Sequence, residues 1–166
     1  MRHIISILLQ NEAGALARVA GMFSARGYNI ESLTVAPTHD ATVSRLTLVT
    51  MGSDAVIDQI IKQSRKLVDI VEIADLTAVD HLESELLLLK VQIDAKNARA
   101  VVDCVRRHRG TILDETGNSR TVQLTGTGAE VNAFLTELSA IGRVLELVRS
   151  GTAALQAGDG VLATPA

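Results

Sequence analysis

The chain has 166 residues, of which 47% are hydrophobic, and a formal net charge of −3 at pH 7. This length and composition are sufficient for a hydrophobic core, in one domain or in two small ones. The negative charge and an aromatic content of only 2% exclude the basic grooves and stacking platforms of nucleic-acid-binding proteins. No apolar run approaches the ~20 residues of a membrane span, and the first residues lack the pattern of a signal sequence. We therefore expect a cytoplasmic protein that binds neither nucleic acid nor membranes.

Hydrophobic periodicity along the first half predicts the order β-α-β-β-α-β. Leu16, Val19 and Phe23 share one face of a helix that ends at Gly27. Pro37 and the polar residues after it form a turn between two strands. The expected strands are 3–10, 30–37, 43–51 and 68–76, and the expected helices are 15–26 and 54–66.

The second half repeats this order, which indicates an internal duplication. The expected strands are 84–94, 111–116, 120–126 and 143–149, and the expected helices are 97–109 and 129–140. The order is typical of a ferredoxin-like fold, in which two helices cover one face of an antiparallel sheet. We therefore predict an α+β protein of two tandem ferredoxin-like units, residues 1–77 and 78–166, with a mobile tail from residue 151 onward.

The first strand is apolar on both of its faces. It places Ile5, Ile7 and Leu9 on one side and Ile4 and Leu8 on the other. A sheet with helices on one face alone exposes its other face to water, and that face is normally polar. The pattern therefore predicts association of the first unit, either with a second copy as a homodimer or with the second unit.

Three polar or small residues of the first unit predict a ligand site. Gly14 opens the first helix, and the unpaired N–H groups of a helix N-terminus bind carboxylates and phosphates. Asn11 ends the first strand and Asn29 begins the second, so we expect both to gather with the Gly14 amides at one end of the unit. Together these groups would supply donors for a carboxylate and acceptors for an ammonium group, which predicts an amino-acid receptor.

The second unit keeps the architecture of the first but not these residues. Arg26-Gly27 and Arg109-Gly110 end corresponding helices and set an offset of 83 residues between the two halves. At this offset Asp94, Asn97 and Ile112 stand where the first unit has Asn11, Gly14 and Asn29. We therefore expect a ligand site in the first unit only.

Enzymatic machinery is not visible in the sequence. Cys104 is the single cysteine, which excludes an intrachain disulfide, and its helical position predicts an inert, partly buried thiol. The four histidines fall on different elements without metal-ligand spacing, and no nucleophile elbow or phosphate-binding loop is present. The sequence thus predicts no catalytic residue and no metal site.

Three segments closely resemble one family: NEAGALARV at 11–19, FSARGYNIESLTV at 23–35 and SRLT at 44–47. They are similar to the small, regulatory subunit of acetohydroxyacid synthase (acetolactate synthase), and the resemblance runs through essentially the whole chain. The first unit resembles an ACT domain, a ligand-sensing module that pairs side by side. Many ACT domains have proline before the glycine, whereas Ala13 stands here.

The resemblance implies a non-catalytic subunit that activates the catalytic subunit and confers valine feedback inhibition on the synthesis of valine, leucine and isoleucine. Thiamine diphosphate, magnesium and FAD would belong to the catalytic partner. The implied valine site has one wall from one ACT domain and one from its dimer mate. Asn11, Gly14, Ala15 and Leu16 would form the first wall, and Asn29 and Ile30 the second.

Two alternatives remain. Ferredoxin-like acylphosphatases also bind an anion at the first strand-to-helix loop, but they use an arginine there, whereas Arg18 lies a full turn inside the helix. The chain would then be an enzyme. An ACT-type amino-acid sensor that regulates a different enzyme would differ only in its partner.

Overall fold

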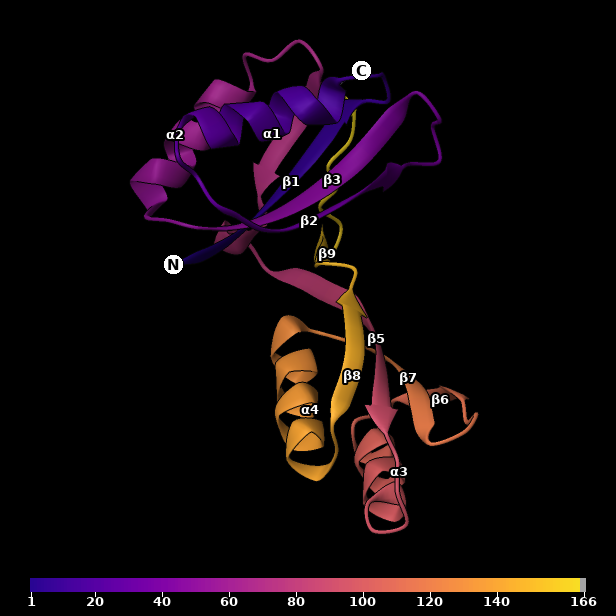
Figure 1. The fold of residues 1–166 in the computed structure, drawn as a ribbon. Helices are drawn as coiled ribbons and strands as arrows, with labels where there is room; N and C mark the ends of the chain where they lie inside the picture. The colour runs from indigo at the N-terminus through magenta and orange to yellow at the C-terminus, as the bar shows by residue number, and fades with distance from the viewer. Residues whose placement is uncertain (165–166) are drawn as a thin grey trace. The chain divides into compact units, whose positions relative to one another are not determined.

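The computed structural model describes residues 1–164 and has two compact units (Figure 1). The first unit contains residues 1–82 and the segment that begins at Thr152, and the second contains residues 83–151. The contacts thus divide the chain after residue 82 and group the segment from Thr152 with the first unit, whereas the prediction divided it after residue 77 and kept residues 78–166 together. Residues 165 and 166 of the predicted tail lie outside the described residues.

The first unit has the β-α-β-β-α-β order that the sequence predicts, and its strand order is β2-β3-β1-β4. All three pairings in this sheet are antiparallel. A short 3-10 helix, η1, and a strand near the C-terminus, β9, complete the unit. The elements are β1 (Arg2–Gln10), α1 (Ala15–Ala25), β2 (Ile30–Pro37), β3 (Val43–Met51), α2 (Asp54–Ser64), β4 (Ile70–Asp75), η1 (Leu76–Ala78) and β9 (Ala153–Gln156).

The bounds of β2 and β3 agree with the prediction, whereas β4 begins two residues later. The chain is still turning after α2, because the Leu67 amide donates to Ser64 O at 2.9 Å and the Ile70 amide to Leu67 O at 3.1 Å. Val68 is 92% exposed for this reason. Val68 therefore belongs to the turn between α2 and β4 and does not begin the strand.

One face of the first sheet packs on α1 and α2 and forms the core of the unit. Ile5, Ile7 and Leu9 of β1 are at most 2% exposed, as alternate positions on one face of a strand require. The apolar stripes of the helices close the other side of this core with Ala15, Val19, Met22, Phe23, Ile57 and Ile60.

The opposite face of the first sheet is covered by the C-terminal segment of the same chain. In Figure 1 this segment, in yellow, passes behind the strands of the sheet. Thr152 and Ala154 are 4% and 6% exposed, and Ala154 packs with Ile4, Val49 and Leu76. The apolar residues on this face are therefore buried within one chain. Their burial removes the argument that a second copy must cover them, and the segment expected to be mobile contains β9.

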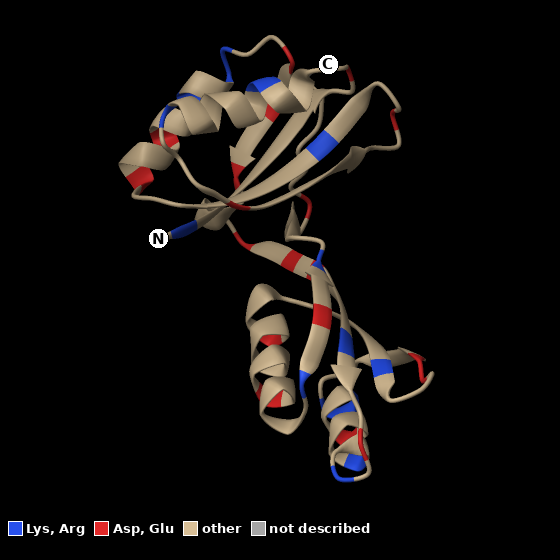
Figure 2. Ribbon diagram, in the orientation of Figure 1, with Lys and Arg blue, Asp and Glu red and all other residues tan. Residues whose placement is uncertain are grey.

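Arg45 crosses the covered face and ties it to the C-terminal segment. Charged residues are sparse on β1 and β3 (Figure 2), where the sequence has only Arg2 and Arg45. Arg45 Nε donates to Ser6 Oγ at 3.0 Å, and Nη2 donates to Ala154 O at 3.3 Å. Burial lowers the pKa of this guanidinium from its ordinary value.

Ala154→Lys should destabilise the first unit, because it places a charge in an apolar site beside Arg45. We expect a loss of about 2 kcal/mol or more in the free energy of unfolding. The chain has one tyrosine, Tyr28, and no tryptophan, so tyrosine fluorescence during urea unfolding reports on the first unit alone. Leu155→Lys is the matched control, because Leu155 is 57% exposed. Equal stability of the two variants would show that the segment does not cover the sheet in solution.

The second unit has the same order of elements and the strand order β6-β7-β5-β8. Its core contains Leu87, Leu89 and Val91 of β5 and residues of both helices. Among residues 1–164 no helix is long and apolar enough to cross a membrane. The elements are β5 (His81–Gln92), α3 (Ala98–Arg107), β6 (Thr111–Asp114), β7 (Ser119–Gly126), α4 (Gly128–Ile141) and β8 (Val144–Arg149).

Candidate functional site

The loop between β1 and α1 presents an uncapped helix N-terminus. Gly14 is the N-cap residue of α1, in the left-handed conformation with φ 88°, and no side chain caps the helix. Glycine adopts this conformation without strain. The Ala15 amide donates to Glu12 O at 3.2 Å, and the next amides belong to the first turn, which lacks partners within a helix. The loop can therefore direct backbone N–H groups at a carboxylate.

The other residues predicted to form the first wall of the site, Asn11, Ala15 and Leu16, have side chains in different surroundings. Ala15 is 1% exposed and belongs to the core, so only its backbone faces the loop. Leu16 is 37% exposed and is available as an apolar contact for a ligand. Asn11 braces the turn that precedes β3: its Nδ2 donates to Ala41 O at 2.8 Å, and its Oδ1 accepts from Ser44 Oγ at 3.1 Å. One N–H of the Asn11 amide remains for a ligand.

Arg18 and Asp69 form an ion pair beneath the Gly14 loop. Arg18 Nε and Nη2 each donate to one oxygen of Asp69, both at 2.5 Å. The Asp69 side chain is 5% exposed and that of Arg18 is 50% exposed. A Cβ atom added to Gly14 would lie 2.8 Å from Arg18 Nη1, so the guanidinium also borders the loop. Sequence reasoning missed this pair, because the two residues are 51 positions apart and no motif links them.

The pair makes the first unit sensitive to acid. The hydrogen bonds from Arg18 hold the pKa of Asp69 below its ordinary value of 3.8. A carboxyl group whose pKa is lower in the folded state stabilises the fold above its unfolded pKa, and this contribution disappears as the pH falls through the folded pKa.

Asp69→Asn should therefore weaken the first unit at pH 7 and flatten its acid response. We expect the wild-type chain to lose stability below about pH 4, and the variant to lose less because it has no carboxyl group to protonate. Urea midpoints from Tyr28 fluorescence at pH 7 and pH 3 measure both effects. Asp58→Asn, at an exposed position of α2, is the control and should follow the wild type. An unchanged acid response in Asp69→Asn would contradict the assignment.

The second predicted wall lies at the opposite end of the sheet in the same chain. Ile30 pairs with Thr50, and Thr50 pairs with His3 near the start of β1, whereas Asn11 follows the end of β1. At about 3.3 Å per residue, the strand between His3 and Asn11 spans roughly 25 Å. The expectation that Asn11 and Asn29 gather at one end of a single unit is wrong. The reason is that α1 runs back along β1 and returns the chain to its starting end before β2 begins (Figure 1).

Asn29 is nevertheless placed to contact a ligand or a partner. It is exposed, and its backbone O accepts from Thr50 Oγ1 at 2.6 Å. Within residues 1–164 its side-chain amide has no hydrogen-bond partner. Ile30 is half-buried and packs on the core. The Thr50 hydrogen bond fixes the backbone of Asn29, so the side-chain amide of Asn29 has a defined position from which to make a polar contact.

The corresponding loop of the second unit is filled by its own side chains. Asn97 is the N-cap residue of α3, as Gly14 is of α1, which confirms the offset of the two halves. Asp94 Oδ1 accepts from the Lys96 and Asn97 amides at 2.8 and 2.9 Å, and Asn97 Oδ1 accepts from the Asp94 amide at 2.8 Å. These contacts occupy three N–H donors of the loop before α3, although α3, like α1, has no side-chain cap.

Comparisons with known proteins match both units. Residues 5–72 match the family model of the AHAS small subunit-like ACT domain, and residues 84–158 match that of the small subunit of acetolactate synthase. The chain is 46% identical over 162 residues to the acetolactate synthase isozyme 3 small subunits of Escherichia coli (strain K12) and Salmonella typhimurium. Each alignment covers 98% of this chain and 99% of the relative.

A solved structure agrees with these matches. The crystal structure of the acetolactate synthase small subunit from Thermotoga maritima is 32% identical and has a TM-score of 0.87, over 96% of this chain and 99% of that one. The predicted α+β class, with two tandem ferredoxin-like units of which the first is an ACT domain, is confirmed. Because both units match along nearly their whole length, the chain belongs to the acetolactate synthase small subunit family.

Proposed function

We propose that this chain is the regulatory subunit of acetohydroxyacid synthase, which activates the catalytic subunit and confers feedback inhibition by valine on branched-chain amino-acid synthesis. Membership of the small-subunit family supports the choice of enzyme. The observation that carries the effector proposal is the uncapped start of α1 at Gly14, in its left-handed conformation. It offers a neutral zwitterion a set of N–H donors for its carboxylate.

The proposed valine site is shared between two copies of the chain. Asn11, Gly14, Ala15 and Leu16 lie at one end of the first sheet, and Asn29 and Ile30 at the other. One chain therefore cannot place both walls around a small ligand. A homodimer in which the two ACT units lie side by side brings the first wall of one copy to the second wall of the other, twice by symmetry.

The proposal assigns chemistry to the partner and sensing to this chain. The catalytic subunit would hold thiamine diphosphate, magnesium and FAD, and this chain would hold none of them in the effector site. Valine has a carboxylate for the α1 amides, an ammonium group for amide oxygens, and a small apolar side chain that Leu16 can contact. No residue of this site is assigned a catalytic role.

The acylphosphatase alternative depends on a free arginine for its acyl-phosphate substrate. Nε and Nη2 of Arg18 are both bound to Asp69, which leaves Nη1 beside the Gly14 loop. This pairing favours a structural role for Arg18. The isolated chain should accordingly release no phosphate from an acyl phosphate above the uncatalysed rate.

Reconstitution with the catalytic subunit of the same organism tests the proposed function. Acetolactate formation should increase when the chain is added in excess, and valine should then reduce it. The chain alone should form no acetolactate. If the chain neither changes the rate nor co-purifies with that subunit, it regulates a different enzyme and the proposal fails.

A further inference from the structure

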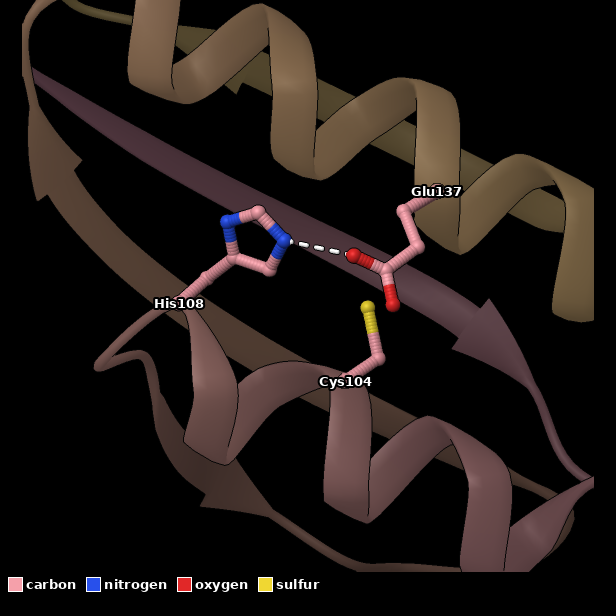
Figure 3. A group of neighbouring side chains, drawn as sticks. All are labelled: Cys104, His108 and Glu137. Atoms are coloured by element: carbon pink, nitrogen blue, oxygen red, sulfur yellow. Dashed lines mark hydrogen bonds and ion pairs between the residues drawn. The ribbon is translucent and has the colours of Figure 1, made fainter.

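Three metal-ligating side chains of different kinds converge between the helices of the second unit. Cys104 lies in the last turn of α3, and His108 is the C-cap residue one turn later. Glu137 faces both of them from α4 (Figure 3). One potential ligand atom from each residue lies within 4.8 Å of the others. The sequence alone predicts no metal site, because the third ligand comes from a helix that begins about twenty residues later.

The spacing of Cys104 and His108 suits one bound ion. Residues four positions apart on a helix point from the same face, and their ligand atoms can reach a common point. A zinc ion with bonds of about 2.3 Å to sulfur and about 2.0 Å to nitrogen or oxygen holds its ligands roughly 3.3–3.6 Å apart. The ligand atoms lie within 4.8 Å of one another, so the longest separation has to shorten by roughly 1.2–1.5 Å, whereas the 2.7 Å between His108 Nε2 and Glu137 Oε2 has to widen. Side-chain rotation provides both movements.

The groups around the cluster hold its members in position without a metal. His108 Nε2 hydrogen-bonds Glu137 Oε2 at 2.7 Å, and Arg107 pairs with the other carboxylate oxygen. The His108 ring also packs on the Phe134 ring, with centroids 5.3 Å apart. These contacts keep His108 and Glu137 side by side before an ion arrives. Arg107 holds Oε1 of Glu137, so Oε2 remains the oxygen that can leave His108 and bind an ion.

Burial and exposure are arranged as a metal site of this kind requires. Cys104 is fully buried, whereas the side chains of His108 and Glu137 are 22% and 37% exposed. An ion can enter from the solvent side and retain water as a fourth ligand. Without metal, burial raises the pKa of the Cys104 thiol to about 11, so binding must displace the thiol proton to the buffer.

We propose that Cys104, His108 and Glu137 form a zinc site that links α3 to α4 in the second unit, separate from the effector site of the first unit. One thiolate, one imidazole and one carboxylate, with an open fourth position, form a donor set that suits zinc in tetrahedral geometry. Thiolate and carboxylate together outweigh the positive charge of Arg107, so the ion meets a net negative site.

Cobalt is the probe for the test, because a tetrahedral Co²⁺–thiolate centre absorbs visibly and in the near ultraviolet, whereas zinc is silent. The full chain should bind one equivalent of Co²⁺ with a sulfur-to-cobalt charge-transfer band, and one equivalent of Zn²⁺ should abolish the band. Cys104→Ser should remove the band, and His108→Gln should weaken Co²⁺ binding by more than about tenfold. Glu137→Gln should also weaken it.

His81→Gln is the matched control, since His81 bonds only to the backbone of its own turn among the described residues, and its Co²⁺ spectrum should equal that of the wild type. Far-ultraviolet circular dichroism checks that each variant is folded. The wild-type spectrum does not depend on any variant, so a folded wild-type chain without a charge-transfer band overturns the proposal. Wild-type absorption in Cys104→Ser overturns it as well.

Discussion

Gly14→Asp should produce a synthase that remains activated but resists valine. The aspartate would place bulk and a like charge where the valine carboxylate meets the start of α1. Each lost charge-assisted hydrogen bond costs about 1.5–3 kcal/mol, so valine affinity should fall by more than about tenfold. The measurement is acetolactate formation at increasing valine, with the catalytic subunit saturated by the variant.

The fold should tolerate this change. A left-handed residue other than glycine costs about 1 kcal/mol, and aspartate is among the residues that adopt this conformation most readily. The new Cβ meets only the guanidinium of Arg18, whose Nη1 is the nearest atom at 2.8 Å. Because Asp69 holds Nε and Nη2 of this group, the guanidinium has to shift while it keeps its partner. A negative charge at the N-terminus of a helix is also mildly stabilising.

Gly117→Asp is the matched control for Gly14→Asp. Gly117 has φ 62° and no atom within 4 Å of an added Cβ, so the strain and the charge are similar but the site is in the second unit. Its valine inhibition should equal that of the wild type. Wild-type inhibition in Gly14→Asp would disprove the carboxylate position. Lost activation in a folded variant would show instead that the loop contacts the catalytic subunit.

A one-to-one mixture of Gly14→Asp and Asn29→His chains should recover valine binding that neither variant has alone. Each variant homodimer has one damaged wall in both of its sites. In a heterodimer one site has two damaged walls and the other has two intact walls. Random pairing makes about half of the dimers heterodimers, so about a quarter of the wild-type sites should return. Equilibrium dialysis with labelled valine after co-refolding measures this fraction.

Asn29→His has its own control, Asn118→His. Both asparagines are exposed and accept a hydrogen bond at the backbone carbonyl, but Asn118 is in the second unit. A mixture of Gly14→Asp with Asn118→His should bind valine even before refolding, through the intact Asn118→His dimers. If native mass spectrometry finds heterodimers of Gly14→Asp and Asn29→His that bind no valine, the shared site is wrong.

The local signals in the sequence were strong enough to determine the order of elements in both units. The bounds of β2 and β3 followed from alternating residues and from the turn after Pro37, because strand periodicity and turn chemistry act over a few residues. The offset of the two halves likewise predicted that Gly14 and Asn97 begin corresponding helices. The fold class and the family therefore needed no coordinates.

Pairs of residues far apart in the sequence needed the tertiary structure. The Arg18–Asp69 pair and the approach of Glu137 to Cys104 depend on how helices and strands pack. No local pattern marks them. The end of the sheet at which Asn29 lies also follows from the direction in which α1 returns the chain. Asn11 and Asn29 each adjoin the end of a strand, but this does not show that the two ends lie at the same edge of the sheet.

The sequence by itself determined that the first strand has two apolar faces, and hence that both must be buried. Which segment covers the outer face was determined by the tertiary structure alone. The hydrophobic effect depends on the area removed from water and not on which segment removes it. A partner copy, the second unit or the tail would satisfy the pattern equally. The packing of Ala154 on Ile4 and Val49 shows that the chain's own C-terminal segment does so.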